Sequence, residues 1–97
     1  MLYRFKSKAD SDLFMNQAPA ERILSIIGKE PGAQGIIEPP AMADAIARLQ
    51  AAVADDERAR ADAGGAPRGI TLHQRAWPFI QLLKRSLDAD EPVVWGV

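Results

Sequence analysis

Cysteine is absent from the chain, and histidine occurs only once, as His73. Without thiols the protein cannot form disulfides, thiolate metal sites or a cysteine nucleophile. One imidazole and scattered carboxylates also fall short of the ligand sets that hold transition metals in proteins. We therefore expect no metal and no cofactor, and the lack of cysteine fits a reducing, cytoplasmic environment.

Long hydrophobic runs and an excess of one charge are also missing. No apolar run approaches the roughly 18 residues of a membrane span, and the opening MLYRFKSK has no segment of signal-peptide length. The net charge of −1 argues against a protein that holds nucleic acid or anionic lipid by bulk charge. We expect a cytoplasmic protein with no membrane contact, and we do not expect nucleic acid as its partner.

What is present suffices for one small domain, with 97 residues of which 47% are hydrophobic. Tyr3 and Phe5 alternate with charged residues, which predicts a half-buried strand over 2–6. Residues 9–12 contain Asp and Ser, whose side chains favour turns, and 13–15 then form a short second strand. The two strands are expected to pair as a hairpin.

Two helices are expected in the middle of the chain. Pro19 suits the start of the first helix, and Gly28 suits its end in a left-handed conformation. A loop over 29–35 and a brief extended piece at 36–37 follow, and Pro40 can start the second helix. Its apolar stripe comprises Met42, Ala45, Ile46, Leu49 and Val53.

The apolar stripe of the second helix stops at Val53, so its last turns are expected to project into water. Pairs of an acid with a base one turn later, such as Asp56 with Arg60, can hold those turns. The sequence then predicts a mobile surface excursion at about 58–70, which includes the glycine-rich stretch from Ala63 to Gly69. The whole chain, 1–97, is expected to be a single domain.

The last third of the sequence predicts a third helix that begins near Thr71, a break in the helical pattern over 88–92, and a terminal strand at 93–97. A core-facing stripe with helical spacing comprises Leu72, Ala76, Phe79, Ile80, Leu83 and Leu87. Thr71 and Gln74 have the spacing of a capping box. Pro78 predicts either a kink or a first turn followed by a helix that restarts at Trp77.

Assembled, the order is β-β-α-α-α-β, an α+β fold with a three-stranded antiparallel sheet. The terminal strand needs a neighbour for its backbone groups, and the simplest arrangement places the strands in the order second, first, last. The helices cover one face, and the other carries Arg4, Lys6 and alternate residues of the last strand. Which face of the last strand is buried stays open, with burial of Trp95 favoured.

Few residues are candidates for a functional site. His73 and Trp77 lie one helical turn apart, with Arg75 between them in sequence, and could form a small enzymatic or ligand-binding site. The competing interpretation is a boundary histidine whose neighbouring tryptophan closes the edge of the core. The acidic run at 55–57 fans around its helix and does not converge on a metal. Gly32 and Gly35 resemble a GxxG nucleic-acid clamp, but without positive charge between them a plain turn is favoured.

Four separated segments together resemble the domain of unknown function 1840 family: LYRFKSK, IIGKEPGAQGII, QRAWPFIQLLKR and EPVVWGV. The resemblance spans nearly the whole chain and is weakest over 54–69. It implies a short cytosolic protein found mainly in proteobacteria, and it implies no activity, ligand or catalytic residue.

The sequence therefore favours a non-enzymatic interaction or regulatory module that binds a protein partner or associates with itself. The alternative is the small enzyme or ligand-binding protein with its site near His73 and Trp77. The candidate contact patch comprises Arg4, Lys6, His73, Trp77 and Trp95, and no catalytic, cofactor-binding or metal-binding residue is assigned.

Overall fold

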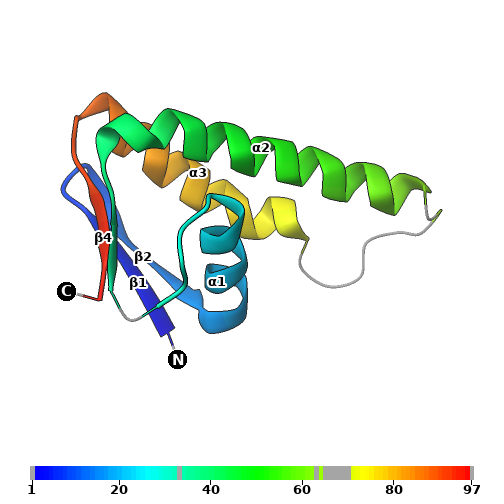
Figure 1. Ribbon diagram of the computed structural model, residues 1–97, viewed down its shortest axis with the longest axis horizontal. Helices are drawn as coiled ribbons and strands as arrows, with labels where there is room; N and C mark the ends of the chain where they lie inside the picture. Colours follow the sequence, from blue (N-terminus) through cyan, green and yellow to red (C-terminus); the bar gives the residue numbers. More distant parts are fainter. Residues whose placement is uncertain (1, 33, 63, 65–70, 97) are drawn as a thin grey trace.

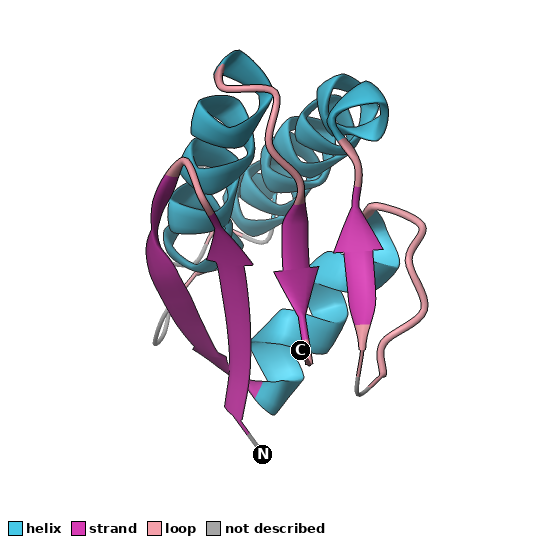
Figure 2. Cartoon of the chain, turned by 90° about the vertical axis from the view of Figure 1, so that its left-hand side faces the viewer, coloured by secondary structure: helices cyan, strands magenta, loops and turns pink. Residues whose placement is uncertain are grey.

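The computed structural model describes residues 2–32, 34–62, 64 and 71–96, and it has a sheet layer and a helix layer (Figure 1). The three helices lie on one face of the sheet and leave the other face open (Figure 2). The elements in chain order are β1 (Leu2–Ser7), β2 (Asp10–Asn16), α1 (Gln17–Ile26), β3 (Gly35–Ile37), α2 (Pro39–Asp62), α3 (Leu72–Asp88) and β4 (Val93–Trp95).

The antiparallel sheet has four strands in the order β2-β1-β4-β3, so the prediction of three strands was wrong. The predicted pairing of the last strand with the first is confirmed, with Phe5 opposite Trp95 and Lys6 opposite Val94. The brief extended piece at 36–37 is the additional strand, and Ile36 lies opposite Val94. Pairing on both sides satisfies the backbone groups of β4, which a single neighbour would leave half unpaired.

The hairpin forms as predicted, but its turn is shorter than expected. The turn occupies only Lys8 and Ala9, and β2 already begins at Asp10. Asp10 accepts a 2.6 Å hydrogen bond from Arg85 near the end of α3, which holds the pKa of Asp10 below its usual range. Ser7 and Ser86 also bond across 2.7 Å. These contacts tie the hairpin end of the sheet to the last turn of α3.

The core lies between the sheet and the helices and centres on three aromatic rings. Phe5 packs edge-on against Phe79 of α3 at 4.9 Å between ring centroids, and against Trp95 of β4 at 5.7 Å. Trp95 is 2% exposed, so the favoured inward orientation of β4 is confirmed. The sheet and α3 therefore share one aromatic contact at the centre of the fold.

Helix α1 begins at Gln17, two residues before the predicted start at Pro19. Pro19 still lies in the first turn, where the amide of a helix has no partner and its loss costs nothing. Gly28 ends the helix with φ 81°, and Lys29 donates its amide to the carbonyl of Leu24 at 2.8 Å. The predicted left-handed helix end at Gly28 is therefore confirmed.

Helix α2 continues to Asp62, so the first five residues of the predicted surface excursion at 58–70 are helical. Of the remainder, residues 63 and 65–70 lie outside the described residues. Arg60 and Asp56 pair at 2.9 Å as predicted, and Figure 1 shows the end of α2 extending past the start of α3. No helix in the described ranges is both long and apolar enough to cross a membrane.

Helix α3 has the predicted capping box, since Thr71 and Gln74 each bond a backbone amide of the other. Pro78 lies inside a continuous helix, which rules out the restart at Trp77, one of the two predicted alternatives. One missing amide bond is tolerated here because the helix buries seven residues against its neighbours.

Substitution of Gly35 tests the pairing of β3 with β4. A β-carbon at Gly35 would overlap the indole ring of Trp95, whereas one at Gly32 would meet nothing within 4 Å. We expect Gly35→Ala to lower the free energy of unfolding by about 1–3 kcal/mol, the usual cost of overpacking. Gly32→Ala should change it by less than about 0.5 kcal/mol, as surface substitutions do. Urea denaturation of both variants measures this, and equal stability would contradict the four-stranded sheet.

The ion pair of Asp10 and Arg85 predicts how the stability of the fold depends on pH. Because the folded-state pKa of Asp10 is lowered, the stability that the pair contributes is present above the pKa of an unfolded aspartate, about 3.9. It is lost as the pH falls through the folded-state pKa. We expect Arg85→Gln to raise the pKa of Asp10 in a carboxyl ¹³C NMR titration. Lys84→Gln, which removes a neighbouring charge, should leave it unchanged, and the opposite pattern would refute the contact.

Candidate functional site

The five residues of the predicted contact patch lie in three separate places. Arg4 and Lys6 lie on the open side of the sheet, and His73 and Trp77 lie on α3. Trp95 is buried in the core, so it cannot contribute to a surface patch. The prediction of a single contact patch was therefore wrong. The exposed residues belong to two separate surfaces, one on the sheet and one between helices.

The first surface is the open sheet face, which we define by seven side chains that point away from the helices. Two rows are visible in the strand register: Phe14 lies opposite Arg4, and Val94 lies between Lys6 and Ile36. The seven residues are Leu2, Arg4, Lys6, Asp12, Phe14, Ile36 and Val94.

This face is unusually apolar for a surface that no helix covers. Leu2 is 57% exposed, Phe14 56% and Ile36 40%. They are three of the five large hydrophobic side chains exposed in the described part of the chain. Arg4 and Asp12 pair across the same face at 3.4 Å, so its charges partly offset one another.

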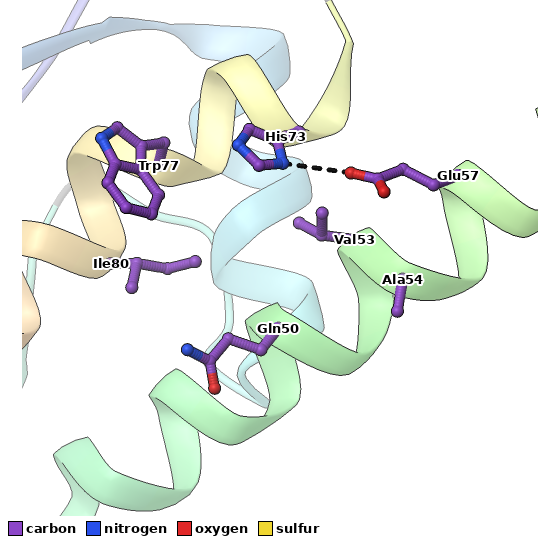
Figure 3. A pocket seen from close by; sticks show the side chains of 7 residues that line it. All are labelled: Gln50, Val53, Ala54, Glu57, His73, Trp77 and Ile80. Carbon is purple, nitrogen blue, oxygen red and sulfur yellow. Dashed lines mark hydrogen bonds and ion pairs between the residues drawn. The ribbon is translucent and has the colours of Figure 1, made fainter.

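The second surface is the helix groove, an open depression of about 280 Å³ between α2 and α3 (Figure 3). Helix α3 supplies one wall and part of the floor, and α2 supplies the other wall. The lining residues are Gln50, Val53, Ala54, Glu57, His73, Trp77 and Ile80. The predicted end of the apolar stripe at Val53 explains the groove, because the two helices are no longer held together by large side chains beyond that point.

His73 and Trp77 form one wall of the helix groove, as their one-turn spacing requires. Their rings stack with centroids 5.9 Å apart and planes at 11°. His73 Nδ1 lies 3.0 Å from Glu57 Oε1 on α2, a contact drawn as a dashed line in Figure 3. An ionised carboxylate only accepts hydrogen bonds, so Nδ1 carries the proton and donates it.

The groove supplies a histidine and a carboxylate that orients it, which is part of a general-base arrangement. None of its seven lining residues carries a hydroxyl, thiol or amine that could act as a nucleophile. Arg75 lies elsewhere, in a depression shared with Arg22 and Pro19. Apart from Glu57 and His73, the lining of the helix groove is apolar or aromatic, with one amide from Gln50.

Comparison with known proteins identifies the family. The model of the family described as Domain of unknown function (DUF1840) matches residues 1–95. The chain belongs to this family. No curated protein and no solved structure matches it. The resemblance noted in the sequence is confirmed, and the family description adds no activity, ligand or partner.

For three residues of the two surfaces, the sequence of this DUF1840 member did not predict the orientation, the pairing or the contact that the structure shows. Phe14 was assigned to a three-residue strand with no orientation, although alternation with buried Met15 indicates that it faces outward. Ile36 was placed in an isolated extended piece. Glu57 was placed in the acidic run at 55–57, and its side chain is indeed exposed, but its contact with His73 was not predicted. Within the described ranges no group of three or more His, Asp or Glu residues could hold a metal ion.

Fluorescence can check that Trp95 is buried and that Trp77 is exposed. Trp95 is buried and Trp77 is 52% exposed, so their indole rings experience different solvents. We expect Trp77→Phe to leave a blue-shifted emission that acrylamide quenches several-fold less than the emission of the unmodified protein. Conversely, Trp95→Phe should leave a red-shifted and readily quenched emission. Equal quenching of the two single-tryptophan proteins would contradict the assignment.

Proposed function

We propose that this protein is a non-enzymatic interaction module that associates with a second copy of itself through the open sheet face. The observation that carries the proposal is the exposure of Leu2, Phe14 and Ile36 on the one sheet face that the helices leave bare. Exposed apolar side chains on an uncovered face are typical of protein contact surfaces, and here Arg4 and Lys6 on β1 divide them into two groups.

A second copy is the partner that fits this face best. Leu2 and Phe14 lie on the β1 and β2 side, and Ile36 and Val94 lie on the β3 and β4 side. A two-fold axis parallel to the strands, between β1 and β4, relates the two copies in this arrangement. The β1 and β2 side of each copy then packs against the β3 and β4 side of the other. Such an isologous contact needs no partner of opposite charge, and this face carries Arg4 and Lys6 together with Asp12.

The size of the face sets the strength of the association. Four strands spaced about 4.8 Å apart and a rise of about 3.3 Å per residue give a footprint on the order of 400 Å². Stable interfaces bury about 800 Å² on each partner. We therefore expect a weak, concentration-dependent dimer, as suits a regulatory contact in the cytoplasm, and not an obligate one.

Analytical ultracentrifugation from micromolar to millimolar protein tests this function. We expect a reversible dimer at the upper end, and a monomer throughout for Phe14→Asp, because the charge would be desolvated in the contact. Leu87→Asp is the matched control. The predicted place of Leu87 on the core-facing stripe was wrong, because it is an exposed apolar residue on α3, away from the open sheet face. A strict monomer at millimolar concentration would contradict the proposal. So would a dimer that Leu87→Asp dissociates and Phe14→Asp does not.

A further inference from the structure

Glu57 differs from Asp44, Asp55 and Asp56 on α2 because it forms no ion pair with a lysine or arginine of the described residues. Three other acids of this helix each pair with an arginine three or four residues on: Asp44 with Arg48 at 2.8 Å, Asp55 with Arg58 at 3.2 Å and Asp56 with Arg60 at 2.9 Å. Within the described part of the chain, Glu57 bonds only His73. Among the described residues, no lysine or arginine lies within ion-pair distance of its carboxylate.

The carboxylate of Glu57 is held in place over the helix groove. His73 Nδ1 donates to Oε1 at 3.0 Å, and the imidazole is itself fixed by stacking on Trp77. The second oxygen, Oε2, makes no hydrogen bond to any described residue. This leaves one oriented acceptor at the edge of the groove, next to an exposed aromatic wall (Figure 3).

The floor and the size of the groove limit what can fill it. Val53, Ala54 and Ile80 make the floor apolar, so the occupant needs an aliphatic part as well as a polar end. Pockets for drug-sized ligands measure about 300–1,000 Å³. At about 280 Å³, the groove is suited to one side chain and too small for a nucleotide or a larger cofactor.

We propose that the helix groove binds an arginine side chain from an exposed segment of a partner protein. A guanidinium is cationic, and it bonds a carboxylate such as that of Glu57 directionally. It is also planar, so it stacks on the face of an indole such as that of Trp77. The methylene stem of the arginine covers Val53 and Ile80. A lysine ammonium offers the charge without the stacking plane.

This site is separate from the open sheet face. The groove lies between the two long helices, and the helices occupy the other side of the sheet (Figure 2). The two contacts can therefore form at the same time, and an experiment that disproves one of them does not bear on the other.

NMR titration of the ¹⁵N-labelled full chain tests the ligand chemistry with two small probes. N-butylguanidinium carries the charge and the stem, and N-butylurea has nearly the same shape without the charge. We expect millimolar binding of butylguanidinium, about tenfold tighter than that of butylurea. The indole N–H of Trp77 should shift and that of buried Trp95 should not. Equal affinity for the two probes, or shifts confined to residues outside the groove, would overturn the proposal.

Two variants separate the roles of charge and stacking. Glu57→Gln keeps the shape of the side chain, and we expect it to weaken butylguanidinium binding at least fivefold. Glu38→Gln is the matched control, because Glu38 is an exposed acid outside the groove. Trp77→Leu should weaken binding several-fold while the spectrum of the core stays unchanged. Unaltered binding in Glu57→Gln would overturn the assignment.

A pair of peptides tests whether the ligand is an arginine of a polypeptide. We expect acetyl-Gly-Gly-Arg-Gly-Gly-amide to bind at least as tightly as butylguanidinium, and the peptide with lysine in place of arginine to bind several-fold more weakly. Equal binding of the arginine and lysine peptides would overturn the guanidinium assignment. Binding of butylguanidinium without binding of either peptide would overturn the assignment to a partner protein.

Discussion

The insertion of β4 between β1 and β3 is the constraint on which the structure depends. It joins the last described residues of the chain to its first strand and to a segment near residue 36, all within one sheet. Trp95 is thereby placed over Gly35 and against Phe5, where only a glycine leaves room for the indole ring. Because α3 leads directly into β4, this pairing also holds α3 against the sheet through Phe79.

The position of β4 determines how the two faces of the sheet are used. With Val93 and Trp95 turned toward the helices, Val94 must point to the open side, where it lies between Lys6 and Ile36. All three helices are on the same side, so no described helix covers the apolar residues of the other side, and Leu2, Phe14 and Ile36 are exposed. The open sheet face is thus a direct consequence of the strand order and of alternation.

The helix groove follows from a different constraint, the length of α2. This helix continues for nine residues after its last apolar core position, Val53, and α3 begins beside that extension. Across the gap the helices meet through polar and aromatic side chains, with Glu57 on one and His73 on the other. A surface with an oriented carboxylate beside a stacked tryptophan is the result.

Local patterns in the sequence were sufficient for much of the fold. The capping box at Thr71, the helix end at Gly28 and the pairing of the first and last strands are each set by a few residues with a clear physical preference. Strand β3 was missed because its three residues are too few to show a period. The contact of Glu57 with His73 was missed because it depends on how two helices pack, which spacing along one helix does not reveal.

The central claim is that the strand order leaves one sheet face bare and that a second copy covers it. Isotope-filtered nuclear Overhauser spectroscopy tests this most directly, on a concentrated mixture of ¹³C-labelled and unlabelled protein. We expect intermolecular contacts between the Phe14 ring and the methyl groups of Ile36 and Val94. Intermolecular contacts confined to the helix side, or none at all at millimolar concentration, would contradict it.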